Sequence, residues 1–110
     1  MVRAPGHLQP ATRKWWRSVA SDYVLESHHL RLLTLAAEAW DRCQQARELL
    51  AVNGLTFEDR WGQPHGRPEI AVERDSRLAY ARLLRELDLD VEPPRGSPRP
   101  PALRSNSEGG

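Results

Sequence analysis

The segment Ser27–Gly54 has the apolar spacing of an α-helix along most of its length, and it predicts one long helix. Its apolar residues form two neighbouring stripes that together cover more than half of the helix circumference. The first stripe contains Leu30, Leu33, Ala37 and Trp40, and the second contains Leu32, Leu35, Ala36, Ala39, Cys43, Ala46 and Leu50. A surface helix normally has one such stripe, about 100° wide. A helix with two stripes needs two partners, and in a chain of 110 residues we expect the second partner to be another copy of the chain.

A shorter helix is predicted before this segment, over Pro10–Asp22. Proline suits the first helical position, where its missing N–H group costs nothing. Trp15, Val19 and Tyr23 recur every four residues and therefore share one face. Gln9 is a poor N-cap, so we expect the start of this helix to fray.

The long helix is expected to begin with Ser27 as its N-cap and to end at Gly54. A third helix is predicted over Pro68–Leu87, with proline again at its first position. Its apolar part, residues 78–89, is expected to pack against the long helix. The short connections favour antiparallel neighbours, so the sequence predicts a long helical hairpin.

Between the long helix and the third helix, a small β-hairpin is predicted. Leu55–Glu58 is a short β-like run, and Asp59–Gly62 has aspartate and glycine at the first and fourth positions of a type I turn. The chain then returns through His65. Two strands alone are marginally stable in water, so we expect the hairpin to lie on the helices or on a neighbouring subunit. Phe57 and Trp61 are the side chains expected to make that contact.

The fold class expected from these elements is mainly α, with three helices and one β-hairpin. Residues 1–9 are expected to form an arm, residues 10–92 a helical domain for oligomerisation and DNA contact, and residues 93–110 a flexible, basic, proline-rich tail. So short a helical domain has a small core, which is marginal unless neighbouring copies share it. The residues expected in the core or in a subunit interface are Leu33, Ala36, Trp40, Cys43, Phe57, Trp61 and Leu84.

No catalytic, cofactor-binding or metal-binding motif is present in the sequence. His28 and His29 are adjacent and point about 100° apart on a helix, whereas metal-binding histidines on helices are spaced by three or four. Cys43 lies on the apolar stripe and is expected to be a buried structural thiol. No secretory signal is recognisable, and every apolar run is far shorter than the ~20 residues that a membrane span needs. We therefore expect a cytoplasmic protein that acts by binding rather than by catalysis.

Charge is distributed unevenly along the chain. Residues 1–25 contain four basic residues and one acid, residues 68–92 contain four arginines and seven acids, and residues 93–110 contain three arginines and one acid. Such asymmetry favours head-to-tail contact between copies, although a soluble surface of mixed sign explains it equally well. The DNA-binding candidates are Arg3, Arg13, Lys14, Arg17, Arg95, Arg99 and Arg104. Trp15 and Trp16 lie among these residues, but their helical spacing favours a core position over stacking on bases.

The order of these features resembles that of a known family. Residues 7–10 lead into the tryptophan-bearing helix, residues 50–54 end the long helix as Leu-x-x-x-Gly, and residues 59–62 form an Asp/Gly turn. Arg67-Pro68 precedes the last helix, which closes on the sequence Glu-Leu-Asp-Leu at residues 86–89. Over roughly residues 7–92 the chain resembles the small terminase subunit of tailed phages, in the short siphophage-type family that includes gene-transfer-agent relatives.

The resemblance implies a homo-oligomeric ring of roughly 8–11 copies, closed by a rotation axis. It also implies binding to double-stranded DNA in the bacterial host cytoplasm and delivery of that DNA to the large terminase subunit, which is the ATPase and nuclease. Two positions depart from the family pattern, because Asp88 replaces a usual glycine and Gln9 a usual serine. A short leader before His7 fits the loose DNA choice of a gene-transfer-agent relative. The alternatives that remain are a small dimeric helical DNA-binding regulator and a protein-only interaction module.

Overall fold

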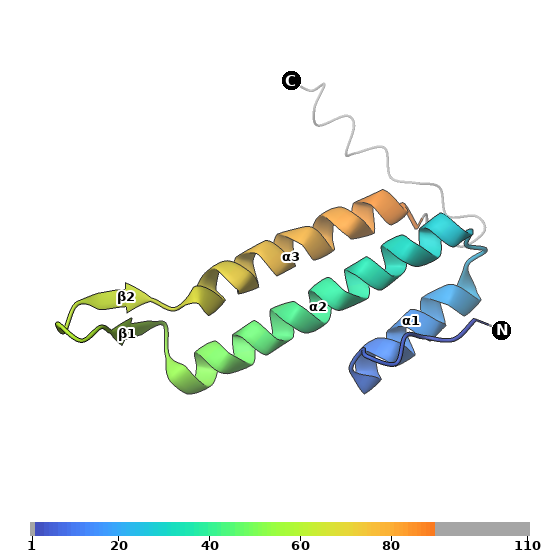
Figure 1. Ribbon diagram of the computed structural model, residues 1–110. Coiled ribbons are helices and arrows are strands. Elements are labelled where there is room, and N and C mark those ends of the chain that lie inside the picture. The colour runs from blue at the N-terminus through green and yellow to red at the C-terminus, as the bar shows by residue number, and fades with distance from the viewer. Residues whose placement is uncertain (1, 90–110) are drawn as a thin grey trace, which may run out of the picture.

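The computed structural model describes residues 2–89 and shows three helices and a two-stranded antiparallel sheet. The elements are α1 (Pro10–Asp22), α2 (Ser27–Asn53), β1 (Thr56–Glu58), β2 (Pro64–Gly66) and α3 (Pro68–Leu87). α2 and α3 run side by side in opposite directions, α1 lies along the first half of α2, and the β-hairpin projects from the far end (Figure 1). The predicted mainly α fold, its helical hairpin and its β-hairpin are therefore confirmed. Residues 93–110, predicted to be a flexible tail, lie outside the described residues.

The main core lies where all three helices meet. Trp16 and Val19 from α1 pack with Leu33 and Ala37 from α2, and Leu87 from the end of α3 closes the cluster. The spacing of three and four residues in each helix brings these side chains to one face. Leu33 is at the centre, with no exposed surface. The first apolar stripe of α2 is thus covered within the chain.

The second stripe of α2 is also covered, by α3. Ala36, Cys43 and Ala46 are buried, and these small side chains allow α3 to approach closely along most of α2. The prediction that this stripe lacks a partner in its own chain is therefore wrong, because one long helix can pack against two others on adjacent sides. Leu35 is the member of the stripe that stays half exposed. On α3, Leu84 packs against the core as predicted, whereas Leu78 is exposed.

The N-terminus of α2 differs by one residue from the prediction. Glu26, not Ser27, is the N-cap, and its backbone N–H donates to Nδ1 of His29 at 3.1 Å. This is one half of a capping box, with histidine in place of the usual Glu or Gln. His29 therefore serves the helix end, which agrees with its being a polar residue of the first turn. At the other end, Gly54 has φ of 85° and donates its N–H to the Leu50 carbonyl, so a glycine is required there.

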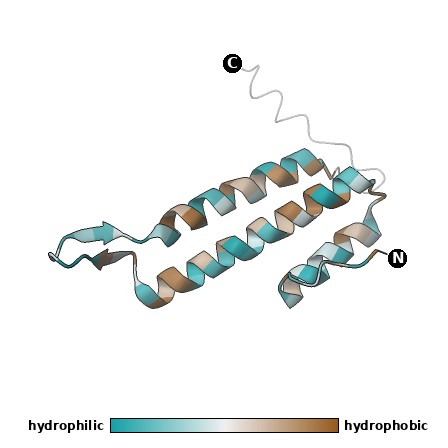
Figure 2. Ribbon diagram, in the orientation of Figure 1, coloured by the Kyte–Doolittle hydropathy of each residue, from teal (hydrophilic) through white to brown (hydrophobic). Residues whose placement is uncertain are grey.

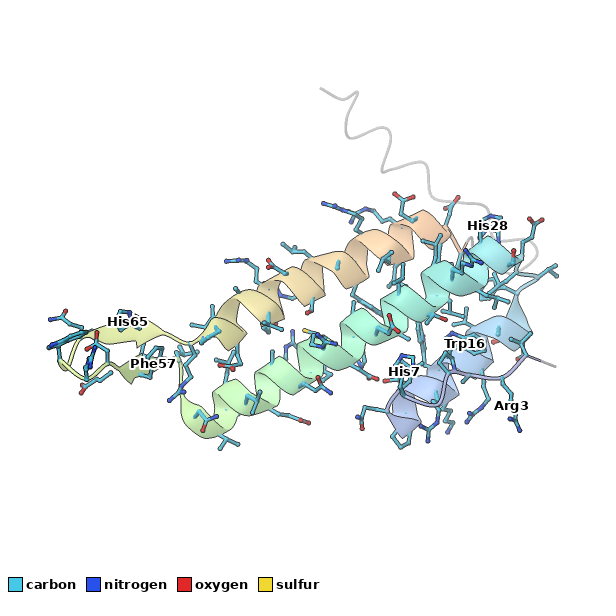
Figure 3. The ribbon with its side chains drawn as sticks, in the orientation of Figure 1. Arg3, His7, Trp16, His28, Phe57 and His65 are labelled. Carbon is cyan, nitrogen blue, oxygen red and sulfur yellow. The ribbon has the colours of Figure 1, made fainter. Side chains whose placement is uncertain are left out.

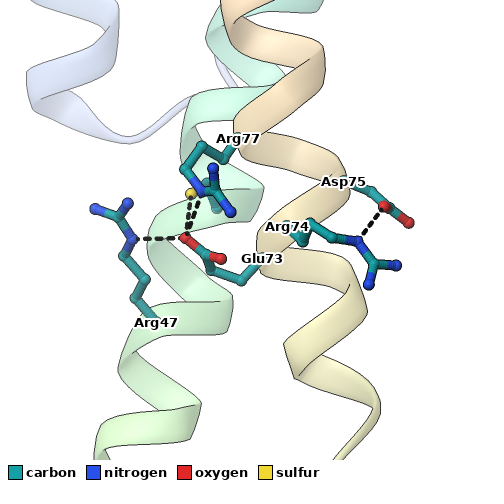
Figure 4. Close-up of polar contacts among 6 residues, drawn as sticks. Arg47, Glu73, Arg74, Asp75 and Arg77 are labelled. Carbon is teal, nitrogen blue, oxygen red and sulfur yellow. Dashed lines mark hydrogen bonds and ion pairs between the residues drawn. The ribbon is translucent and has the colours of Figure 1, made fainter.

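A charged cluster ties α3 to α2 near the middle of the helical hairpin (Figure 4). Oε2 of Glu73 on α3 accepts hydrogen bonds from Nε of Arg47 at 3.0 Å and Nε of Arg77 at 3.4 Å, and the thiol of Cys43 lies 3.6 Å away. Glu73 and Arg77 are four residues apart on α3, the spacing at which an acid and a base pair on one helix face. The hydrogen bond from Arg47 is the main cause that lowers the pKa of Glu73 below its ordinary value, with the charge of Arg77 adding to it.

The lowered pKa of Glu73 predicts a pH-dependent contribution to stability. The ionised carboxylate stabilises the folded chain at neutral pH, and this contribution is lost as pH falls through the folded-state pKa, which lies below the ordinary Glu value of about 4.3. Glu73→Gln is expected to flatten the decline in the free energy of unfolding between about pH 5 and 3. Urea unfolding at several pH values measures this decline, with Glu86→Gln at an exposed position of the same helix as a matched control. An unchanged acid slope in Glu73→Gln would contradict the assignment.

Asp59 organises the turn of the β-hairpin. Its Oδ1 accepts from the N–H groups of Trp61 and Gln63 at 2.8 and 2.9 Å, and its Oδ2 lies 2.8 Å from Nε2 of His65. The Gly62 N–H donates to the Asp59 carbonyl at 2.9 Å, as expected for the predicted four-residue turn. The hydrogen bond from Gln63 is the largest cause that lowers the pKa of Asp59. The turn thus holds Trp61 at the tip in a defined position.

The hairpin stands clear of the helices of its own chain (Figures 1 and 3). Trp61 is 72% exposed and Phe57 39% exposed, and both strands are exposed throughout. Phe57 stacks on His65 across the strands, and the Arg60 guanidinium lies over the Trp61 ring at 4.5 Å. Of the two supports predicted for the hairpin, its own helices are therefore excluded. Contact with a neighbouring subunit stays a prediction.

Candidate nucleic-acid interface

The position of α1 depends on a carboxylate from another helix. Asp41 on α2 is buried, and its Oδ2 accepts from the Gln9 N–H at 2.8 Å while its Oδ1 accepts from the Thr12 hydroxyl at 2.5 Å. A negative charge at a helix N-terminus also interacts favourably with the helix dipole. The Gln9 side chain makes no capping hydrogen bond, so Asp41 caps α1 in its place. The expectation that this helix start frays is not met, because the cap comes from the tertiary structure.

The segment before α1 makes contacts with both α2 and α1. Leu8 is buried in the core cluster, and Nε2 of His7 lies 2.7 Å from Oε2 of Glu38 on α2. Nη1 of Arg13 on α1 donates to the carbonyl oxygens of Gly6 and Leu8, at 3.2 and 2.6 Å. These contacts hold the arm against α1, so the basic side chains of both segments share one surface. Figure 3 shows Arg3 on the arm beside α1.

This shared surface is a basic groove. Arg3, Arg13 and Arg17 line a groove of about 490 Å³ between the arm and α1. Lys14 and Arg17 line a second hollow directly beside it. The structure therefore brings together the four basic candidates from the first part of the sequence. Arginine side chains bind phosphate oxygens with paired N–H groups, and lysine adds a point charge, so the groove suits a phosphate backbone.

Within the groove the four side chains have different roles. Arg13 is partly buried and already engaged with two backbone carbonyls, so it positions the arm. Arg3, Lys14 and Arg17 are exposed. These three are therefore the side chains available to an incoming polyanion. Arg95, Arg99 and Arg104, the other candidates, lie outside the described residues.

The tryptophans of α1 do not belong to this groove. Trp16 is buried in the core, and its Nε1 donates to the Thr34 hydroxyl at 3.2 Å. Trp15 faces the opposite side of α1, where its ring centroid lies 6.2 Å from that of Tyr80 on α3. The sequence-based preference for a packed position over base stacking agrees with this placement. Recognition by the groove would rest on charge rather than on stacked bases.

The candidates for core or interface fall into two groups. Leu33, Ala36 and Cys43 are buried within the chain, and Leu84 is partly buried against the core. Trp40, Phe57 and Trp61 are exposed, so only these are accessible to another molecule. Burial raises the pKa of the Cys43 thiol, which disfavours the reactive thiolate. Asp41 and Tyr80 were not predicted from the sequence. Nothing local marks an aspartate as the cap of a distant helix, and the approach of Tyr80 to Trp15 and Trp40 depends on how α3 packs.

Within residues 2–89 the structure contains no group of three potential metal ligands. In the same part of the chain, no helix is both long enough and apolar enough to cross a membrane.

Comparison with protein families gives one informative match. A family model described as phage terminase, small subunit, matches residues 12–93, which is most of the chain. The match begins inside α1 and includes α2, the β-hairpin and α3. Comparisons with curated proteins and with solved structures gave no significant match.

Proposed function

The chain belongs to the phage terminase small subunit family, and from this premise we propose that it is a non-catalytic adaptor for DNA packaging. The family indicates a role in packaging viral DNA. In the proposed function the chain binds double-stranded DNA through the basic groove, assembles into a homo-oligomeric ring, and recruits and regulates the large terminase subunit. The observation that carries the proposal is the grouping of Arg3, Lys14 and Arg17 on one exposed surface in a member of this family.

A single copy offers only a few phosphate contacts, so a monomer would bind DNA weakly at physiological salt. Repetition of the groove around a ring supplies many contacts to one DNA molecule, and the linked contacts raise the overall affinity without any new chemistry. Assembly and DNA binding are therefore two parts of the same proposal. Binding through phosphates alone carries little sequence information, which fits an adaptor with loose DNA choice.

Contact with the large subunit is assigned to surfaces outside the groove. Residues 68–92, which include α3, contain seven acids against four arginines, and residues 93–110 contain Arg95, Arg99 and Arg104. Charged surfaces of opposite sign on one chain allow DNA and a protein partner to be bound at the same time. Stimulation of large-subunit ATPase activity, measured with the full chain and with residues 93–110 removed, tests whether that segment is the docking element.

The DNA-binding face is tested by removing charge from it. Lys14/Arg17→Gln is expected to lower affinity for duplex DNA about equally for all sequences, because phosphate contacts carry no base specificity. It should also reduce the slope of log affinity against log salt by about 2 per engaged copy, since each lost contact removes about 0.9. Titrations of labelled duplex from about 50 to 200 mM salt measure both quantities.

The matched control is Arg82/Arg85→Gln, which removes the same charge from exposed positions of α3 outside the groove. It should leave the salt slope unchanged. Equal effects of the two double variants would mean that the net charge, not the groove, determines binding. No effect of Lys14/Arg17→Gln would place the DNA elsewhere, and a wild-type chain that binds no duplex would favour the protein-only interaction module.

A further inference from the structure

At the end of the molecule that carries the β-hairpin, the described elements do not cover the apolar side chains. α1 packs beside α2 only as far as Asp41, so beyond that point α2 has α3 on one side and no partner on the other. Among residues 2–89, seven of the twelve exposed large hydrophobic side chains belong to this end: Leu49, Val52, Leu55, Phe57, Trp61, Ile70 and Val72. Figure 2 shows hydrophobic residues in this part of α2 and in β1. We call residues 49–72 the hairpin end.

Trp61 is the most prominent member of the hairpin end. Its exposed ring stands at the tip of a turn that Asp59 fixes through two backbone hydrogen bonds. A tryptophan held in place before binding loses little conformational entropy when it docks. Large aromatic side chains of this kind are the usual anchors of protein interfaces. The Arg60 guanidinium lies over the ring from within the same turn, but the helices of residues 2–89 do not cover it, so the tip has the properties of an interface anchor.

A matching hollow lies where the start of α1 meets the middle of α2 and α3. Ala11, Thr12 and Trp15 from α1, Trp40 from α2 and Tyr80 from α3 line an apolar groove of about 320 Å³, which we call the aromatic groove. The ring centroid of Tyr80 lies 5.2 Å from that of Trp40 and 6.2 Å from that of Trp15, in tilted arrangements that leave ring surface available. Trp40 is 42% exposed. The groove has the size and lining of a site for one large apolar side chain.

The hairpin cannot reach the groove of its own chain. About 20 Å of α2 separates Trp40 from Asn53, and the hairpin points away beyond that residue (Figure 1). We propose that Trp61 of one copy docks in the Trp15–Trp40–Tyr80 groove of a second copy. This contact is head-to-tail, so each copy offers one free tip and one free groove, and a rotation that closes the series gives a ring. The inference rests on the homo-oligomeric part of the proposed function and names the side chains that form it.

A second copy fits the hairpin end better than DNA or the large subunit does. A two-stranded hairpin is marginal in water, so it needs a cover whenever the chain is folded, including when no packaging partner is bound. A second copy of the chain can supply this cover without a packaging partner. The two surfaces complement each other on one chain and require no third molecule.

The test uses two variants of the full chain at exposed positions. Trp61→Ala removes the anchor, and Ala11→Arg places a long charged side chain over the groove while leaving the core intact. Each is expected to raise the dissociation constant between copies by at least about 30-fold, the effect of losing an interface hot spot. At a protein concentration where the wild type is assembled, the native mass of each variant should be that of a monomer. Val24→Ala, at a fully exposed apolar position away from both surfaces, should keep the wild-type mass.

Mixing the two variants tests the head-to-tail geometry directly. Trp61→Ala keeps an intact groove and Ala11→Arg keeps an intact tip, so the mixture is expected to form a heterodimer and to stop there. The proposal is overturned if either variant keeps the wild-type mass, if the mixture stays monomeric, or if the wild type is itself a monomer. It is equally wrong if Trp61→Ala stays assembled and loses affinity for DNA or for the large subunit, because the tip would then bind that partner.

Failure of this inference and failure of the adaptor function give different results. The DNA test changes Lys14 and Arg17, which lie outside the aromatic groove and the hairpin end. Loss of assembly in Trp61→Ala together with no DNA binding by the wild type would uphold the docking contact and overturn the adaptor. Salt-dependent DNA binding together with an unchanged mass of Trp61→Ala would uphold the adaptor function and overturn the docking contact.

Discussion

Asp41→Ala is expected to lower the free energy of unfolding by about 3 kcal/mol, because it removes two charge-assisted hydrogen bonds from a buried position. The Gln9 N–H and the Thr12 hydroxyl would lose their acceptor, and α1 would lose the carboxylate at its N-terminus. Urea unfolding followed by circular dichroism, at equal protomer concentration, measures the change. Since α1 carries Lys14 and Arg17, the variant should also weaken DNA binding without touching a basic residue.

Two further substitutions make this test specific. Asp75→Ala removes an exposed acid of α3 and should change stability by no more than about 0.5 kcal/mol. Asp41→Asn keeps an oxygen acceptor and loses the charge, so its stability should fall between that of Asp41→Ala and that of the wild type. If Asp41→Ala were as mild as Asp75→Ala, the cap from α2 would not be what holds α1 in place.

Leu33→Ala is expected to destabilise the chain by about 2–5 kcal/mol. Leu33 is fully buried at the meeting point of the three helices, so its truncation leaves a cavity that Trp16, Ala37 and Leu87 line. A domain of this size has a total stability of only roughly 5–15 kcal/mol, and a loss at the upper end of the range would unfold much of the population. Thermal unfolding of the wild type and the variant at equal concentration measures the loss.

Leu35→Ala is the matched control, since it makes the same chemical change two residues away on the same helix. Leu35 is 50% exposed, so its truncation should cost much less than that of Leu33. The comparison separates the effect of burial from the effect of helix propensity, because alanine is favourable in both positions. Similar losses for the two variants would contradict the placement of the core at Leu33.

The helices and the hairpin were predictable because their determinants are local. Pro10 and Pro68 begin helices where a missing N–H is tolerated, and Gly54 ends α2 with a positive φ. Asp59 and Gly62 mark the turn between the two short strands, and the structure contains their hydrogen bond. The same local logic failed at the start of α2, where the cap is Glu26 with His29 rather than Ser27. Neighbouring residues compete closely for the N-cap position, so propensity alone does not choose between them.

The candidate site was predictable as a set of charges but not as an arrangement. Lys14 and Arg17 are close in sequence, so their shared surface on α1 follows from the helical period. The role of Arg13 as a tie to the arm depends on carbonyl groups of Gly6 and Leu8, which no sequence pattern indicates. The arm was expected only as a basic extension, and the burial of Leu8 makes it part of the core.

The sequence by itself determined the order, length and apolar faces of the helices, because backbone preferences and the helical period act over a few residues. It also determined that α2 has two apolar stripes and that the chain is short of core. Only the tertiary structure decided that α1 and α3 cover these stripes, so that the exposed apolar surface lies at the hairpin end instead. It likewise decided that Asp41 caps α1 and that Trp15, Trp40 and Tyr80 share one groove. Those contacts join residues far apart in the chain, and packing between elements, not local preference, selects them.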